Sequence, residues 1–95
     1  MEILEQVQHN EGESRYELAT ECGLAVADYE HQGGAMLITH TGVPRALEGR
    51  GIGSRLIRGV LADARRRGLK VVPLCSFVAT YITRHPEERD LLAHC

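Results

Sequence analysis

Three glycines alternate with other residues in the stretch Gly49–Ser54, and a helical pattern follows it without a break. The apolar residues that share one face of this helical period are Leu56, Ile57, Val60, Leu61 and Ala64. The first turn of a helix leaves backbone N–H groups unpaired and carries partial positive charge. A glycine loop that opens such a helix therefore predicts an anion site, best suited to phosphate or pyrophosphate. The alternative is a tight strand-to-helix turn that binds nothing.

Two familiar phosphate-binding motifs do not fit this stretch. The P-loop requires a lysine between its last glycine and a serine or threonine, whereas Ser54 follows Gly53 directly. The dinucleotide fingerprint requires a third glycine where the chain has Leu56. The sequence therefore disfavours nucleotide binding of either kind. A side chain at Gly51 or Gly53 is expected to block the approach of a pyrophosphate and to leave the fold largely intact.

His40 and Cys75 are two further residues whose positions suggest chemistry. His40 stands late in the apolar run before the loop, and a histidine ordinarily titrates near pH ~6.5, so it could accept a proton at neutral pH. Cys75 stands directly before a second helical pattern, and a helix N-terminus lowers the pKa of a thiol. Both have structural alternatives. His40 could fix the turn from Thr41 to Pro44, and Cys75 could be a small buried side chain.

The segment Glu48–Gly53 resembles the acetyl-CoA loop of the GCN5-related N-acetyltransferases, whose pattern is Gln/Arg-x-x-Gly-x-Gly/Ala before a long helix. Gly51 and Gly53 match its glycine positions, and Glu48 departs from its first position. Two flanking motifs resemble the small one-domain branch of this family: His-Thr-Gly-Val-Pro at 40–44 and Pro-Leu-Cys-Ser-Phe-Val at 73–78. The resemblance runs from about Leu18 to Leu92, nearly the whole chain.

This resemblance implies an α/β (α+β) acyl-CoA N-acyltransferase fold, in which a mixed central sheet has helices on its faces. It also implies that the long N-terminal helices, which larger members place over the substrate, are absent. Acetyl-CoA is the implied cofactor: the backbone of Gly49–Ser54 would hold its phosphates, and the strand Met36–Thr41 would run beside its pantetheine arm. The residues expected to bind it are Ile38, Thr39, Thr41, Val43, Gly49, Arg50, Gly51, Ile52, Gly53, Ser54 and Arg55.

The expected catalytic residues are His40, Cys75 and Tyr81. His40 would take the proton of the amine. The resemblance implies that Tyr81 protonates the departing thiolate, although core packing is an equal alternative for this tyrosine. Cys75 would either receive the acetyl group or only lie near the thioester sulfur. Of these two routes, we favour direct attack by the amine.

The predicted function is transfer of an acetyl group from CoA to a small-molecule or peptide amine. The alternative is a non-catalytic module that binds or senses acyl-CoA together with a protein partner. Two features favour this alternative. A chain of this length offers few residues to line a substrate site, and Glu48 stands where the family pattern has Gln or Arg. Whether the protein acts with a partner or as a homodimer stays open.

The composition limits the remaining classes of function. The chain has 95 residues, which predicts one domain over 1–95, and a net charge of −2, which argues against nonspecific nucleic-acid binding. Its 3 cysteines include no Cys-x-x-Cys, so we expect neither a disulfide framework nor a metal site. The sequence shows no targeting leader and no apolar run of membrane-spanning length, which predicts a cytoplasmic protein without membrane association.

The elements needed to position these residues can be predicted along the chain. The strands expected before the loop are Leu4–Gln8, Arg15–Thr20, Cys22–Tyr29 and Met36–Thr41. Leu24, Val26 and Asp28 mark one face of the third strand, and His31–Gly34 is a hairpin signal.

The main helix is expected from Arg50 or Gly51 to Arg67, with Gly68 as its stop and Arg65–Arg67 as a solvated end. Lys70–Leu74 should lie parallel to the strand before the loop, through a right-handed crossover. Ser76 is expected to cap a second helix, and Pro86 to open a last one. The side chains expected on one side of the second helix are Phe77, Val78, Tyr81 and Ile82. No function is expected for His9, His31, His85 or His94.

Overall fold

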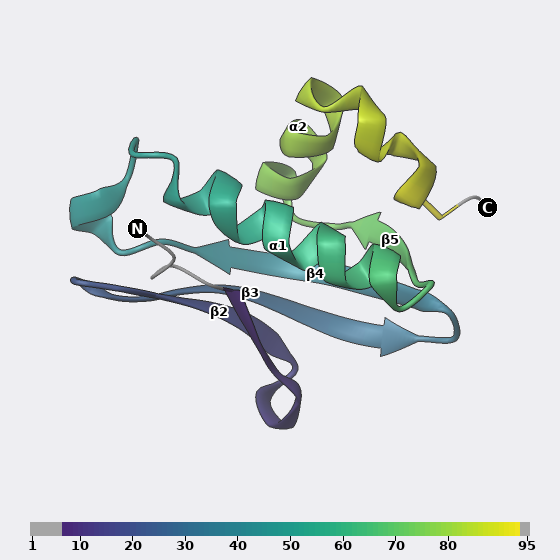
Figure 1. Ribbon diagram of the computed structural model, residues 1–95, viewed down its shortest axis with the longest axis horizontal. Coiled ribbons are helices and arrows are strands. Elements are labelled where there is room, and N and C mark those ends of the chain that lie inside the picture. The colour runs from purple at the N-terminus through teal and green to yellow at the C-terminus, as the bar shows by residue number, and fades with distance from the viewer. Residues whose placement is uncertain (1–6, 94–95) are drawn as a thin grey trace.

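The computed structural model describes residues 7–93 and places five strands in one sheet, in the order β1-β2-β3-β4-β5 (Figure 1). The strands are β1 Val7–Asn10, β2 Arg15–Thr20, β3 Gly23–Gln32, β4 Ala35–Gly42 and β5 Lys70–Pro73. Neighbouring strands from β1 to β4 are antiparallel, and β5 is parallel to β4. The predicted mixed sheet is thereby confirmed. Part of the first predicted strand, Leu4–Gln8, lies outside the described residues.

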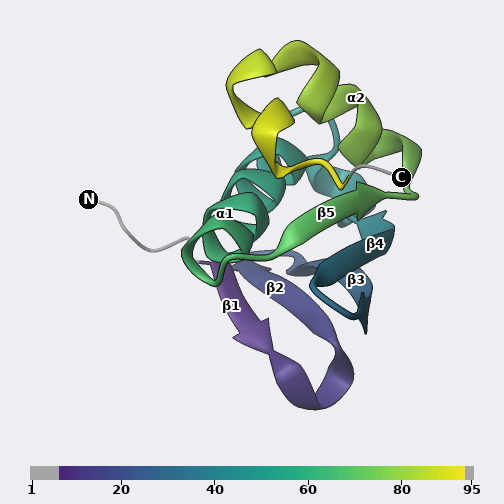
Figure 2. The same cartoon turned by 90° about the vertical axis from the view of Figure 1, so that its right-hand side faces the viewer.

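The helix α1, Ile52–Arg66, forms the crossover between β4 and β5 and lies across the sheet (Figure 2). Its predicted apolar face is confirmed, because all five of the side chains expected on that face are buried. Gly68 follows α1 with a φ of +72°, the left-handed conformation that glycine adopts at little cost, and the chain turns there into β5. Among residues 7–93, no helix is both long and apolar enough to cross a bilayer.

The helix α2, Ser76–Arg84, packs beside α1 above β5 (Figure 2). Val78, Tyr81 and Ile82 are buried as predicted, but Phe77 is 41% exposed. The predicted cap was wrong: Cys75 is the N-cap residue and Ser76 is the first residue of α2. The last predicted helix is a 3-10 helix, Pro86–Leu91.

After this 3-10 helix the chain runs along the free edge of β5. Leu92 forms a parallel bridge with Val71, and the N–H of Ala93 donates to the carbonyl of Val71 over 3.0 Å. The described part of the chain thus ends as a short addition to the edge of the sheet.

Both α-helices of the described residues share one core and cover the same face of the sheet. On β3, Ala25 and Ala27 are the residues buried against α1. Leu24, Val26 and Asp28 do share a face, but it is the opposite one, where Leu24 is 47% exposed. The small alanines bring α1 close to the sheet, and the opposite face of the sheet is uncovered within residues 7–93.

A β-bulge interrupts the pairing of β3 with β4. Asp28 pairs with His40 and Tyr29 pairs with Ile38, so Thr39 has no opposite residue. A bulge of this kind reverses the alternation of side chains beyond it. As a result, Thr41 pairs with buried Ala27 and faces the helices, whereas His40 pairs with Asp28 and faces the open side of the sheet.

Candidate functional site

The two parallel strands separate at the end of the sheet that lies nearest the glycine loop. Pairing of β4 with β5 ends at Ile38 and Pro73, and β4 then continues to Gly42 paired with β3 only. The N–H of Cys75 donates to the carbonyl of Ile38 over 3.0 Å and holds the two diverging chains at the point of separation. A cavity of about 670 Å³ opens beyond it. Its lining residues are His40, Thr41, Val43, Leu47, Glu48, Gly49, Gly51, Ile52, Gly53, Ser54, Cys75, Ser76 and Phe77.

The glycine loop forms one wall of this cavity. Gly49 and Gly51 have φ values of +84° and +80°, and a Cβ added at either would meet no atom within 4 Å. Gly51 is the N-cap of α1, and within residues 7–93 the N–H groups of Ile52, Gly53 and Ser54 have no backbone acceptor. The loop thus presents unpaired N–H groups in a surface without side chains, as a phosphate site requires.

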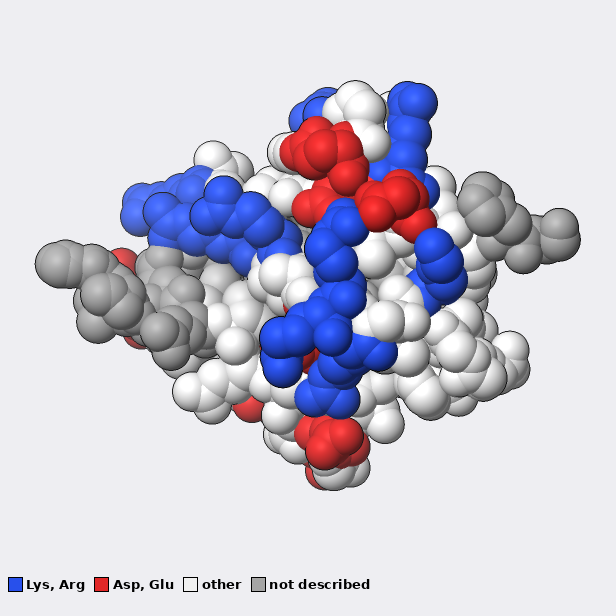
Figure 3. Space-filling view, turned by 45° about the vertical axis from the view of Figure 1, so that its right-hand side comes forward, with Lys and Arg blue, Asp and Glu red and all other residues white. Residues whose placement is uncertain are grey.

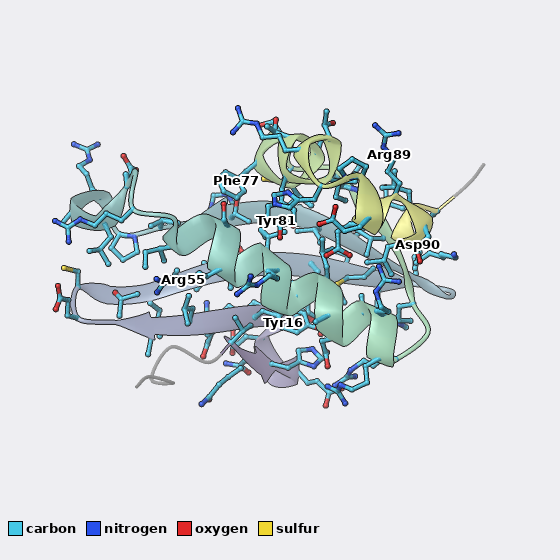
Figure 4. The ribbon with its side chains drawn as sticks, turned by 45° about the horizontal axis from the view of Figure 1, so that its top comes forward. Tyr16, Arg55, Phe77, Tyr81, Arg89 and Asp90 are labelled. Carbon is cyan, nitrogen blue, oxygen red and sulfur yellow. The ribbon has the colours of Figure 1, made fainter. Side chains whose placement is uncertain are left out.

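Gly53 serves a different purpose from the two earlier glycines. A Cβ added there would lie 2.7 Å from Cζ of Phe77, because the first turn of α2 packs on the first turn of α1 (Figure 4). A side chain at Gly53 would therefore press on the Phe77 ring, so a substitution there disturbs the packing of the two helices as well as the loop. Gly51 is the cleaner position for testing the loop, since a side chain there enters open space.

Cys75 lies at the inner end of the cavity. Its Sγ is 3.2 Å from Oγ1 of Thr41, and no capping hydrogen bond of standard geometry forms from its side chain to α2. Burial of the sulfur acts to raise the pKa of the thiol, but the Thr41 hydroxyl and the N–H groups of Val78, Phe77 and Thr41 outweigh it. The pKa of Cys75 consequently lies below that of an ordinary thiol, in the direction that the sequence predicted.

His40 borders the same cavity from the other side of β4. A Cβ added to Gly42 would have two near neighbours. One is Nε2 of His40 at 3.5 Å, and the other is a methyl group of Val26 at 3.7 Å. Val26 belongs to the open face of the sheet, so the imidazole of His40 extends toward that face. Cys75 and His40 therefore border one cavity from opposite sides of the sheet.

Tyr81 does not line this cavity. It is 6% exposed, its ring stacks on that of His85 with the centroids 3.9 Å apart, and burial raises the pKa of its hydroxyl. In Figure 4 it lies between α1 and α2. The side chain thus has the position of a core residue, the alternative that the sequence left open.

Four residues expected to bind the cofactor also lie outside the lining. Ile38 is fully buried in the core, and the Thr39 hydroxyl donates to the carbonyl of Asp28 over 3.3 Å. Arg50 and Arg55 border a separate hollow of about 280 Å³ on the other side of the loop. The remaining residues of the predicted set do line the cavity.

A cluster around Asp63 was missed by the sequence analysis. Asp63 is 8% exposed, accepts a hydrogen bond from the Tyr16 hydroxyl over 2.6 Å and pairs with Arg66 and with Nε of Arg67. Burial acts to raise the pKa of this carboxyl, but Tyr16 and the two arginines outweigh it and hold the pKa below the ordinary value. Spacing along α1 was the available signal, because Arg66 and Arg67 follow Asp63 by three and four positions.

The arginine run at the end of α1 is exposed to solvent, as predicted, and its members also form ion pairs. Arg65 pairs with Asp90 over 2.7 Å and with Glu88 over 2.9 Å, which fastens α1 to the C-terminal 3-10 helix. Figure 3 shows a band of basic side chains that meets acidic ones at both ends. Arg65 therefore links α1 to the 3-10 helix, whereas Arg66 and Arg67 pair with Asp63 of α1 itself.

Comparison with known proteins points to one family. The family model described as GCN5-related N-acetyl-transferase matches residues 15–91. The chain is also similar to the NMR solution structure of a GCN5-like protein from Staphylococcus aureus, with 26% identity and a TM-score of 0.74. That match covers 100% of this chain and 93% of the other. With most of its length matched by the family model, this chain belongs to the GCN5-related N-acetyltransferase family.

Proposed function

We propose that this protein is a small N-acetyltransferase that moves an acetyl group from CoA to an amine by way of Cys75. The observation that carries the proposal is the cavity between β4 and β5, which brings the glycine loop, Cys75 and His40 to one place. Membership of the family supports acyl transfer as the type of reaction.

The residues of the cavity fit a CoA thioester. The N–H groups of Ile52, Gly53 and Ser54 would bind its pyrophosphate. The end of β4 beyond its pairing with β5, from Thr39 to Gly42, would lie beside the pantetheine arm. When bound, acetyl-CoA supplies an acetyl group already activated as a thioester. Glu48 also borders the cavity, and its side chain replaces the Gln or Arg of the family pattern.

The position of Cys75 in the lining of the cavity, with the Thr41 hydroxyl oxygen 3.2 Å from Sγ, leads us to propose the route through this sulfur over direct attack by the amine, and the lowered pKa of the thiol acts in the same direction. In the first step the Cys75 thiolate bonds to the acetyl carbon, and CoA leaves as a thiolate. In the second step the amine bonds to the same carbon, the bond to Sγ breaks, and the Cys75 thiolate is restored. Exchange between two thioesters costs little free energy, so a single cleft can carry both steps.

His40 is the proposed base of the second step. Its imidazole extends toward the open face of the sheet, so an amine arriving from that side could transfer its proton there. Cys75 would meanwhile receive the acetyl group on the side of the helices. The amine would enter from the open face and reach the acetyl group on Cys75 through the cavity that both residues line.

The test is release of free CoA from acetyl-CoA in the presence of polyamines, amino acids and lysine peptides. We expect at least one amine to accelerate the release well above hydrolysis. Replacement of His40 by alanine should slow it by roughly 10²-fold, the contribution of a general base, with acetyl-CoA affinity near that of wild type. Undiminished release across neutral pH in His40→Ala would remove this histidine from the mechanism.

A Gly51→Val variant tests the loop in the same assay. The valine enters open space but needs a backbone with φ near +80°, so the loop must rearrange or block the phosphates. We expect calorimetry to show loss of CoA binding in a variant that stays folded. Normal CoA affinity would contradict the assignment of the loop.

A protein that binds acetyl-CoA tightly but releases no CoA with any amine would instead be the non-catalytic module. Glu48, in place of the Gln or Arg of the family pattern, is the feature that favours this second function.

A further inference from the structure

Thr41 is the residue that the bulge in β4 turns toward Cys75. Without the unpaired Thr39, residue 41 would lie on the open face of the sheet together with Leu37. With it, Thr41 faces the helices opposite Ala27, and its hydroxyl oxygen lies 3.2 Å from Sγ of Cys75. Bulges often aim side chains at functional positions, and this one brings a hydroxyl to a thiol 34 residues away in the sequence.

The backbone of Thr41 faces the same sulfur. β5 has ended before this point, so the edge of β4 has no strand to pair with, and the N–H of Thr41 contributes to lowering the pKa of Cys75. The hydroxyl of Thr41 thus lies against the sulfur from β4, and the N–H groups of Phe77 and Val78 contribute to lowering its pKa from α2.

We propose that Thr41 is a positioning residue, whose hydroxyl donates a hydrogen bond to the Cys75 thiolate and holds Sγ at the inner end of the cavity. The role rests on the proposed function, since it prepares the sulfur that receives the acetyl group. A hydrogen bond to a charged acceptor is stronger than one to a neutral acceptor, so Thr41 stabilises the thiolate more than the thiol.

Other charged groups near the sulfur do not account for this effect. Within the described residues, the other titratable side chains that line the cavity are His40 on β4 and Glu48 before the loop. Arg50 in the loop and Arg55 in the first turn of α1 border a different hollow. On α2, Arg84 is at the far end of the helix from Cys75.

The test is the pH dependence of Cys75 alkylation by iodoacetamide, which follows the fraction of thiolate. It is measured between pH 5 and 10 by peptide mass spectrometry, in a protein that carries Cys22→Ser and Cys95→Ser. In this background Thr41→Val removes the hydroxyl and keeps the branched shape. We expect its alkylation midpoint to lie about one pH unit above that of the parent, the size of one lost charge-assisted hydrogen bond.

Two further variants test whether the midpoint depends on the Thr41 hydroxyl or changes with any threonine-to-valine substitution. Thr41→Ser keeps a hydroxyl and should return the midpoint toward that of the parent. Thr80→Val makes the same change at an exposed position of α2 and should leave the midpoint unchanged. All variants retain His40 and Glu48, so these two side chains affect each variant equally. An unchanged midpoint in folded Thr41→Val, or a midpoint that serine does not restore, would overturn the proposal.

The assay distinguishes this inference from the proposed function because it contains no acetyl-CoA. A midpoint that responds to Thr41, in a protein that never acetylates Cys75, would retain the positioning role and reject transfer through the thiol. If Cys75 is acetylated but the alkylation midpoint does not change in Thr41→Val, transfer through the thiol would be retained and the positioning role of Thr41 rejected.

Discussion

Asp63 is a single residue whose buried negative charge contributes to the stability of the fold. Its carboxylate joins α1 to β2 through Tyr16, and the ring of His9 stacks on Tyr16 with centroids 4.3 Å apart. Arg67 extends the cluster, with its guanidinium 2.9 Å from Nδ1 of His9. A carboxylate this buried is stable in the folded state because each of its neighbours is a hydrogen-bond donor or a cation.

Asp63→Asn should reduce stability and change its dependence on pH. The lowered pKa means that the carboxylate stabilises the folded state above its unfolded pKa of 3.8, and that this contribution is lost as the pH falls toward the folded value. We expect the variant to lose about 1–3 kcal/mol at pH 7, measured by urea denaturation, and to lose less stability than wild type between pH 5 and pH 3. Glu30→Gln, at an exposed position of β3, is the control. If Asp63→Asn and wild type lost the same unfolding free energy between pH 5 and pH 3, the Asp63 carboxylate would not be the group that stabilises the folded state.

At the scale of elements, the contact between the first turns of α1 and α2 shapes the cavity. Gly53 allows the Phe77 ring to rest on α1, and the same packing sets Cys75 at the start of α2, facing Thr41. Both helix N-termini are thereby brought to the place where β4 and β5 separate. One end of the cavity can receive an anion, and the other end holds the Cys75 thiol.

Gly53→Ala tests this contact through its coupling to Phe77. The added Cβ would overlap the ring at 2.7 Å, and overpacking of this kind typically costs about 1–3 kcal/mol. In a Phe77→Ala background the overlap is gone, so the same substitution should cost less than about 1 kcal/mol. Urea denaturation of the four proteins in the cycle measures the coupling. Strictly additive effects would mean that the two helices do not meet in this way.

The same contact explains part of what the sequence could and could not predict. The apolar period of α1, the turn at Gly68 and the parallel strand β5 follow from local spacing, and all three were predicted. The rest depends on contacts between distant residues. No local signal marks Thr39 as a bulge, yet that bulge decides that Thr41 and His40 face opposite sides.

The Asp63 cluster and the packing of Phe77 on Gly53 were missed for the same reason. Tyr16 and Asp63 are 47 residues apart, and only the fold brings them together. The glycine loop, Cys75 and His40 could be predicted as separate features, because each sits beside a recognisable end of a helix or strand. That they border one cavity depends on where β4 and β5 part.

At the scale of the whole molecule, the helices occupy one face of the sheet and leave the other uncovered within residues 7–93. The cavity lies at the end of the sheet where these two sides meet. Under the proposed function, CoA is bound from the side of the two helix N-termini and the amine arrives from the open side. Because no element of the described residues covers that open face, the acceptor amine would make few contacts with this chain.

The most direct measurement is the mass of the peptide that carries Cys75 after the protein is mixed with acetyl-CoA. We expect one acetyl group on this peptide, its absence in Cys75→Ala, and its disappearance when an amine is added, at the rate at which acetylated amine is formed. A wild-type protein that acetylates an amine without ever carrying the group, and a Cys75→Ala variant that does so equally fast, would contradict transfer through this sulfur.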